Sequence, residues 1–259
     1  MPITLTTDFG LRDGFTGVMK GVILGINPGV QVVDISHEIS HGDILDAEFI
    51  LETTVRYFPK GSIHIAVVDP GVGSGRRGLI LRAGGYFFVG PDNGIFTPFF
   101  GEAEKIISIE QKESGHPGFQ GSTFDGRDVF APVAAWLSKG AEQEEFGRQI
   151  NDPIELPLPK PVLQNKNKKL QGRVLHVDRF GNCITNIGIG ELEKLGKKTA
   201  LIRIKAKGRT FGLLDFYLSA KDKDPHGIVN SSGLLEIFVS GGSASHKLSL
   251  KTGAPITVF

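Results

Sequence analysis

The chain begins with apolar runs of two kinds, short ones rich in β-branched residues and longer ones with helical spacing. Strands are predicted at 3–8, 30–36 and 62–69, and amphipathic helices are predicted at 14–26 and 43–57. The run S-I-H-I-A-V-V-D at 62–69 is almost unbroken, which is typical of a strand buried on both faces. Strands that alternate with helices favour an α/β unit with a largely parallel central sheet.

Aspartates fall at the ends of three predicted strands, at Asp8, Asp34 and Asp69. Ligands of such sheets bind beyond the carboxyl ends of the strands, where the following loops meet. We therefore expect a binding or catalytic site at this edge of the sheet.

The pattern changes at 151–172, where four prolines precede a run rich in lysine, asparagine and glutamine. Such a composition predicts a linker, which we place at 156–172. Beyond it, short alternating segments are separated by glycine, aspartate and lysine turns, as in a small all-β domain with a barrel-like or sandwich form. The sequence therefore divides into an α/β domain at 1–155 and an all-β domain at 173–259.

The charge, the apolar runs and the cysteine count of the chain limit the classes of partner and the cellular compartment that we expect. The net charge of +1 provides no global field for nucleic acid or an anionic membrane, so neither is expected as a partner. No stretch approaches the roughly 20 apolar residues of a membrane span, and the first residues lack the features of a signal peptide. Cys183 is the single cysteine, which excludes an internal disulfide and a cysteine-based zinc site. We expect a cytoplasmic protein.

Glycine is abundant, at 35 of 259 residues, and many glycines lie in four short motifs. Glycine permits tight turns, and it also lets the backbone approach a bound ligand closely. Composition alone leaves both interpretations open. The motifs are D-F-G at 8–10, D-P-G-V-G-S-G at 69–75, G-P-D-N-G at 90–94 and R-F-G-N at 179–182.

The loop D-P-G-V-G-S-G-R-R at 69–77 has the glycines of a phosphate cradle but lacks the G-K-[ST] ending of a P-loop. Its glycines are spaced as G-x-G-x-G and it leads into a predicted strand, which disfavours a dinucleotide site. In the alternative interpretation, Asp69 pairs with Arg76 across a tight loop. Such a pair is either a structural ion pair or a site that holds and polarises a water.

The segment S-H-E-I-S-H-G-D at 36–43 invites comparison with metal-binding motifs. Its residues H-E-I-S-H at 37–41 have the spacing of the zincin motif H-E-x-x-H, but that motif requires a helix, and these residues, with His37 and His41 at the two ends, lie between the strand predicted at 30–36 and the helix predicted at 43–57. Loop and capping roles are therefore favoured over metal binding, and no metal site is predicted. His64 lies in an apolar run and is expected to be a core histidine.

Two further segments carry candidate chemistry. In S-T-F-D-G-R-D, Asp125 and Asp128 flank Arg127, which indicates either a helix cap with an ion pair or part of a reaction site. In V-D-R-F-G-N, Phe180 and Asn182 could stack on and hydrogen-bond a planar heterocycle, or the segment could be a simple turn.

Taken together, these segments resemble one family along nearly the whole chain and in the same order, the S-adenosylmethionine (SAM) hydroxide adenosyltransferases. This family is the hydrolase branch of the SAM-dependent fluorinase/chlorinase superfamily. The segments that carry the resemblance are T-D-F-G-x-x-D-x-F-x-G-x-M-K-G at 7–21, V-V-D-I-S-H-E-I at 32–39, V-V-D-P-G-V-G-S-x-R-R at 67–77, G-P-D-N-G at 90–94, T-F-x-G-R-D-x-F-A-P-V-A-A at 123–135, D-R-F-G-N-x-I-T-N-I at 178–187 and N-S-S-G-L-L-E-I at 230–237.

The resemblance implies that water attacks the 5′ carbon of the adenosyl ribose and that adenosine and L-methionine are released. It implies SAM as the substrate, with no metal and no cofactor. It also implies a homotrimer, in which each site lies between the N-terminal domain of one subunit and the C-terminal domain of its neighbour.

The resemblance also implies a role for individual residues. Asp69 and Arg76 match two members of the family's Asp-Arg-His triad, which handles the attacking water. Asp8 would bind the ribose hydroxyls and Asp13 the methionine ammonium group. The remaining implied contacts are adenine stacking by Phe180 and Tyr217, an adenine hydrogen bond from Asn182, and binding of the amino-acid end by Asp178 and Ser231.

The third triad position departs from the family pattern T-F-H-G-R-D, because Asp125 replaces the histidine. Two neighbouring carboxylates, Asp69 and Asp125, can share a proton, so that one acts as a base of raised pKa. The alternatives are a SAM- or adenosine-binding protein without turnover and a halide-dependent adenosyltransferase. The halogenase branch carries an extra loop before the G-P-D-N-G position, whereas only residues 78–89 intervene here, which favours the hydrolase.

Overall fold

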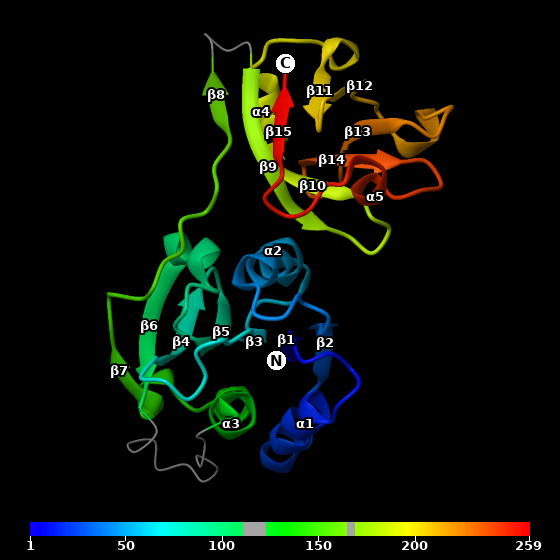
Figure 1. Cartoon of the computed structure of the whole chain (residues 1–259). Helices are drawn as coiled ribbons and strands as arrows, with labels where there is room; N and C mark the ends of the chain where they lie inside the picture. The colour runs from blue at the N-terminus through cyan, green and yellow to red at the C-terminus, as the bar shows by residue number, and fades with distance from the viewer. Residues whose placement is uncertain (111–122, 165–168) are drawn as a thin grey trace. The chain divides into compact units, whose positions relative to one another are not determined.

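A computed structural model describes residues 1–110, 123–164 and 169–259. The chain folds into two compact units, Met1–Leu156 and Pro157–Phe259. Figure 1 shows a mixed α/β architecture in the first unit and a strand-rich architecture in the second.

The first unit is built on one mixed sheet with the strand order β2-β1-β3-β5-β4-β6-β7. The pairings from β2 to β5 are parallel, and those from β5 to β7 are antiparallel. The change of direction follows from the tight β4–β5 hairpin, where Gly84 and Gly85 both have positive φ. The strands are β1 (Ile3–Thr7), β2 (Val32–Ser36), β3 (Ile63–Val67), β4 (Gly78–Ala83), β5 (Tyr86–Pro91), β6 (Ala103–Ile109) and β7 (Gly147–Gln149).

Helices cover both faces of this sheet (Figure 1), with α1 (Phe15–Ile26) and α3 (Ala131–Ser138) on one face and α2 (Ile44–Thr54) on the other. The α/β prediction is thereby confirmed, although the antiparallel half of the sheet was not foreseen. The side chain of Asp43 accepts a hydrogen bond from the Asp46 amide at 3.1 Å, which caps α2 and stabilises it by about 1 kcal/mol.

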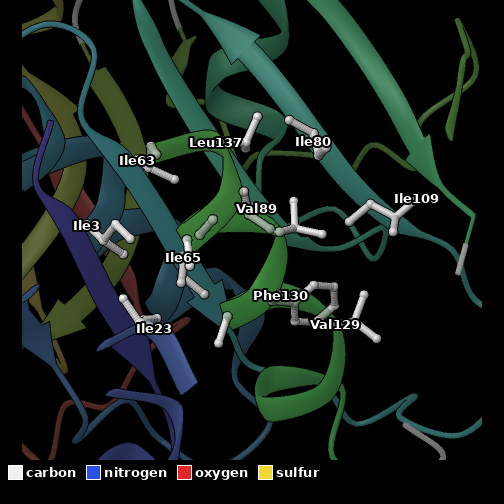
Figure 2. Packing of buried hydrophobic residues seen from close by; sticks show 14 of the residues in the cluster. Ile3, Ile23, Ile63, Ile65, Ile80, Val89, Ile109, Val129, Phe130 and Leu137 are labelled. Carbon is white, nitrogen blue, oxygen red and sulfur yellow. The ribbon is translucent and has the colours of Figure 1, made fainter. Parts of the chain in front are cut away.

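Two apolar clusters fill the spaces between the sheet and its helices. In the cluster shown in Figure 2, Ile23 of α1 and Leu137 of α3 pack with strand residues such as Ile65. On the opposite face, Leu51 of α2 packs in a second cluster with Phe88 of β5. β3 contributes to both clusters and all five of its residues are buried, as expected of a strand covered on both faces.

His64 is the core histidine that the sequence predicts. It is fully buried in β3, and its Nδ1 lies 2.8 Å from the hydroxyl of Thr4 on β1. Burial lowers the pKa of His64 to about 4, so the ring is neutral at physiological pH.

Glu48 is a buried carboxyl group on the core-facing side of α2. The residue is 2% exposed, and neither carboxyl oxygen accepts a hydrogen bond, since the nearby Thr97 hydroxyl donates to the Gly94 carbonyl at 2.6 Å. Burial raises the pKa of Glu48 to about 8, which outweighs the lowering effect of the nearby Thr97 hydroxyl, and the negative charge of Glu52 adds a smaller rise. Glu48 is therefore protonated at neutral pH in the folded protein.

This proton makes the stability of the first unit depend on pH. The unfolded chain releases the Glu48 proton near the ordinary pKa of 4.5 and the folded chain near 8, so the contribution of Glu48 to the free energy of unfolding falls as pH rises between these values, and the lowered pKa of His64 opposes this fall only below the ordinary histidine pKa of 6.5. Between pH 6.5 and 8, where His64 no longer offsets it, we expect a loss of about 2 kcal/mol. Glu48→Gln should flatten the dependence, whereas Glu52→Gln, on the exposed side of the same helix, should preserve it. Urea unfolding curves at several pH values measure both, and parallel curves for wild type and Glu48→Gln would contradict the assignment.

The second unit is an antiparallel sheet with the order β12-β11-β15-β9-β10-β14-β13, with β8 paired to β9. A bridge between Leu213, just after β12, and Gly227 of β13 joins the two ends of the sheet, so the sheet is a nearly closed barrel. The predicted all-β, barrel-like domain is thereby confirmed. Its strands are β8 (Val162–Gln164), β9 (Lys169–Val177), β10 (Cys183–Gly188), β11 (Arg203–Ala206), β12 (Arg209–Gly212), β13 (Pro225–Val229), β14 (Leu234–Val239) and β15 (Pro255–Val258), with short helices α4 (Ile189–Glu193) and α5 (Ala244–Leu248).

Residues 156–172, for which the sequence predicts a linker, include β8 and the first residues of β9. Leu163 and Leu170 are opposite each other in this strand pair, and both contact the core of the barrel. Pairing with a neighbouring strand is a non-local property that the proline and lysine content of the segment does not reveal. Within the described ranges of the chain, no helix combines the length and the apolar character that crossing a membrane would require.

Candidate active site

A cavity of about 320 Å³ opens beside the carboxyl ends of β1 and β3 in the first unit. This is the edge of the sheet at which the sequence predicts a site. Asp8 and Asp69 line the cavity, but Asp34 does not, because it lies within β2 and pairs with Lys20 at 2.6 Å. The lining residues are Asp8, Phe9, Phe15, His41, Val67, Asp69, Pro70, Val72, Thr123, Phe124, Asp125 and Gly126.

Asp69, Arg76 and Asp125 meet at this cavity. The Nε atom of Arg76 donates to both oxygens of Asp69 at 2.9 Å, and Nη2 donates to Asp69 Oδ2 as well. The same Nη2 lies 2.5 Å from Asp125 Oδ2. All three side chains are at most 16% exposed, and the guanidinium carbon lies 5.3 Å from the ring centre of Phe130. One cation thus orients two carboxylates and leaves the group with a net charge of −1.

The loop between Asp69 and Arg76 is closed on itself. The amides of Val72 and Ser74 donate to the carbonyls of Asp69 and Gly71, and the amide of Arg76 faces the Ser74 hydroxyl at 3.3 Å. These amides are occupied within the loop, so they do not form the row of free donors that a phosphate cradle needs. The loop instead folds back on itself, which places the Arg76 side chain next to Asp69.

Asp125 stands directly before a π-helical turn, Gly126–Phe130, that continues into α3. Wide turns of this kind occur often at functional sites. The neighbouring pair is structural, since Arg127 binds Asp128 through two contacts of 2.6 Å. Gly126 is required by packing, because a Cβ atom there would lie 2.9 Å from the ring of Phe124. In S-T-F-D-G-R-D the ion pair is therefore formed by Arg127 and Asp128, while Asp125 contacts Arg76 beside the cavity, and Ser122 lies outside the described ranges.

Asp8 belongs to the same cavity and is held from one side. Its Oδ2 accepts a hydrogen bond from the Gly42 amide at 2.9 Å and lies 3.2 Å from His41 Nδ1, while its side chain is 8% exposed. Asp13, by contrast, is exposed in the loop before α1 and is not among the residues that line the cavity.

Phe180 and Tyr217, the residues implied for adenine stacking, line an open hollow of about 520 Å³ in the second unit. Phe180 is 78% exposed there, and Asn182 and Tyr217 line the same hollow. The hydroxyl of Tyr217 donates to Glu236 at 2.7 Å, and its ring meets Phe238 edge-on at 4.8 Å. Burial, followed by the Glu236 contact, raises the pKa of Tyr217, so its hydroxyl remains a donor. Two aromatic faces and an amide suit a planar heterocycle.

The turn that presents Phe180 is fixed by Asp178, which accepts hydrogen bonds from the amides of Phe180 and Asn182 at 2.9 and 2.8 Å. Gly181 has φ of 80°, and a Cβ atom there would lie 2.1 Å from the Ser243 hydroxyl, so only glycine fits. Asp178 itself does not line the hollow, nor does Ser231, which is exposed in the turn between β13 and β14.

Sequence reasoning missed three phenylalanines that form a wall of the cavity, Phe9, Phe15 and Phe124. Their ring centres lie 5.3 to 5.8 Å apart, so each ring contacts the other two. All three occur in motifs that carry the family resemblance, and that occurrence was the available signal. In the described part of the chain, no cluster of three or more histidine, cysteine, aspartate or glutamate side chains could hold a metal ion.

Comparison with known proteins identifies relatives of both units of the chain. The family model for the SAM hydroxide adenosyltransferase N-terminal domain matches residues 3–147, and that for the C-terminal domain matches residues 172–257. A protein of Salinispora arenicola named (R)-S-adenosyl-L-methionine hydrolase is 36% identical, over 99% of this chain and 97% of its own. Three further proteins with this name are 34–38% identical over 96–100% of this chain.

A more distant relative, from Actinoplanes sp., is named fluorinase and is 27% identical over 99% of this chain and 96% of its own. The crystal structure of an uncharacterized conserved protein from Thermotoga maritima superimposes with a TM-score of 0.91, at 33% identity and 99% coverage of both chains. Because both family models match in order and together cover most of the sequence, the chain belongs to the SAM hydroxide adenosyltransferase family.

Proposed function

We propose that the protein hydrolyses SAM by attack of water on the ribose 5′ carbon, giving adenosine and L-methionine. The observation that carries the proposal is the group of Asp69, Arg76 and Asp125 in a cavity that also contains Asp8. The relatives named (R)-S-adenosyl-L-methionine hydrolase support it, and their name leads us to propose the (R) configuration at the sulfonium centre of the substrate.

The chemistry requires activation of water more than anything else. The departing thioether is neutral, so no acid has to protonate it, and neither a metal nor a cofactor is needed in this scheme. Water is a poor nucleophile that must be oriented and must lose a proton. We assign the base role to Asp69, which Arg76 orients through two nitrogen atoms. Asp8, Asp69 and Asp125 outnumber Arg76, so the cavity has a negative charge that favours a cationic sulfonium.

The same charge disfavours a halide as the nucleophile, because an anion approaching the 5′ carbon would face two carboxylates, Asp69 and Asp125. A protein that binds SAM without turnover is the remaining alternative, since Asp125 replaces the family histidine. Chromatography of the products formed from SAM, with and without chloride, distinguishes the three functions. Equal amounts of adenosine and methionine support hydrolysis, and 5′-chloro-5′-deoxyadenosine would indicate halide transfer. A melting temperature raised by adenosine, without any product, would indicate a binding protein.

For the substrate contacts, we propose that Asp8 accepts hydrogen bonds from the ribose hydroxyls. We propose that adenine binds in the hollow of the second unit, which has the required aromatic faces and amide. The family resemblance is the only support for the contacts to the methionine part of the substrate. Those proposed contacts are made by Asp13, Asp178 and Ser231.

We further propose a homotrimer whose sites form between the first unit of one subunit and the second unit of its neighbour. The charges of the two units support this arrangement. Residues 1–156 contain 12 Lys and Arg against 21 Asp and Glu, a net charge of −9, and residues 157–259 contain 17 against 7, a net charge of +10. Opposite charges attract unlike units of different subunits and keep like units apart.

We also propose a cytoplasmic location, supported by the single, buried Cys183.

Mixing two inactive variants tests this assembly. Asp69→Asn damages only the first unit and Phe180→Ala only the second, so in randomly mixed oligomers about one site in four would combine two intact halves. We expect the co-expressed mixture to show about a quarter of the wild-type rate, with each variant inactive alone. A mixture no more active than its components would show that each site is formed by one chain.

A further inference from the structure

The loops that follow β1 and β2 are tied together around Asp8. The amide of Gly10 donates to the carbonyl of His37 at 2.7 Å, and the amide of Ile39 donates to the carbonyl of Thr7 at 3.4 Å. The amide of Gly42 donates to the Asp8 carboxylate at 2.9 Å. The backbone of the second loop therefore contacts the first loop before, at and after Asp8.

The side chain of His37 lies in the middle of this contact. It is 4% exposed, and its Nδ1 is 2.9 Å from the hydroxyl of Thr7, the residue before Asp8. Its Nε2 is 3.0 Å from Asp34 Oδ1, at ion-pair distance although off the line of a hydrogen bond. The other oxygen of Asp34 binds Lys20 at 2.6 Å. A row of polar groups thus runs from the surface to the residue next to Asp8.

The ionisation state of Asp34 determines which atoms of this row carry protons. Burial raises the pKa of Asp34, but its contacts with Lys20 and His37 outweigh burial and lower the pKa overall. An ionised Asp34 favours a proton on Nε2 of His37, which leaves Nδ1 as an acceptor for the Thr7 hydroxyl proton. The lone pairs of the Thr7 hydroxyl are then available to the amide of Phe9, 3.3 Å away. The Thr7 hydroxyl thereby donates to His37 and accepts from the amide of Phe9.

We propose that His37, held between Asp34 and Thr7, is a positioning residue that orients the Asp8 carboxylate toward the ribose hydroxyls of the substrate. This inference rests on the proposed function, in which Asp8 binds the ribose. Asp8 Oδ2 is already occupied by Gly42 and His41, so the second oxygen must point into the cavity for Asp8 to bind both hydroxyls. A rotation of the loop backbone would misdirect that oxygen, and the contact of the Thr7 hydroxyl with His37 adds a side-chain restraint to the backbone hydrogen bonds that oppose the rotation.

Binding of two nucleosides tests the inference without turnover. Adenosine has both ribose hydroxyls, and 2′,3′-dideoxyadenosine has neither, so the ratio of their dissociation constants measures the contribution of Asp8. We expect Thr7→Val to weaken adenosine binding about ten-fold while dideoxyadenosine binding changes less than about two-fold. Thr7→Ser, which restores the hydroxyl, should recover the wild-type ratio. Asp34→Ala, a change at the exposed end of the row, should lower the ratio in the same direction.

Thr4 provides a matched control on the same strand. Its hydroxyl contacts a buried histidine, His64, in the same way that Thr7 contacts His37, but Thr4 is not adjacent to Asp8. Thr4→Val should lower the melting temperature and leave the nucleoside ratio unchanged. Equal weakening of both nucleosides by Thr7→Val, or an unchanged ratio, would overturn the positioning role. If the wild-type protein bound neither nucleoside and released no product from SAM, the proposed function itself would fail, and the inference with it.

Discussion

Asp69→Asn should lower the rate of SAM hydrolysis by about a thousand-fold or more and leave adenosine binding within about two-fold of wild type. General bases typically contribute factors of about 10² to 10⁴ in rate, and an amide cannot accept the proton of the attacking water. The loss should be large here because the asparagine also gives up part of the double contact with Arg76. Single-turnover rates with SAM and calorimetric titration with adenosine measure the two effects.

Adenosine binding should survive because Asp69 is assigned to the water and not to the nucleoside. The assigned nucleoside contacts come from Asp8 and from the hollow that contains Phe180. Asp152→Asn is the matched control, since Asp152 is an exposed carboxylate that pairs with Arg77, the residue next to Arg76. It should retain wild-type kinetics. A fully active Asp69→Asn protein would remove Asp69 from the mechanism.

In the first unit, local sequence patterns predicted the helices and strands from β1 to β3, which precede the β4–β5 hairpin. The alternation of apolar runs identified β1, α1, β2, α2 and β3 because each segment has its own period. The antiparallel half of the sheet depends on the hairpin at Gly84 and Gly85, and strand direction is set by such turns and not by periodicity. The pairing of β8 with β9 was missed for a similar reason, because it joins segments whose composition is that of a linker.

The candidate site was predicted where its residues are close in sequence. Asp69 and Arg76 are seven positions apart, and a glycine-rich loop can bring them together, so their pairing followed from the sequence. The contact of Arg76 with Asp125 spans 49 positions, and only the resemblance to a family suggested it. The wall formed by Phe9, Phe15 and Phe124 was missed because apolar residues in a motif are read as core residues.

Asp125→His should increase the rate of hydrolysis at neutral pH, by about ten-fold or more, and should change its pH profile. In the present site the single nitrogen Nη2 of Arg76 is shared between Asp69 and Asp125, and the second carboxylate adds negative charge beside the proposed base. An imidazole removes that charge and can accept a proton when it is neutral. Because the unperturbed pKa of histidine is about 6.5, the rate of the variant should rise with pH through this region. Rates of adenosine release across pH 5 to about 9 measure the change.

Asp125→Asn separates the two causes of this acceleration, because it removes the charge without adding a titrating group. If loss of charge alone mattered, Asn and His would accelerate hydrolysis equally and neither would add a limb to the pH profile. If the imidazole transfers protons, only the histidine variant would gain the limb, and the asparagine variant would be slower than it. A histidine variant with the wild-type rate and profile would mean that Asp125 merely holds Arg76 in place. In that case we would assign activation of the water to Asp69, since the other carboxylate and the imidazole that line the cavity in the described part of the chain, Asp8 and His41, contact each other.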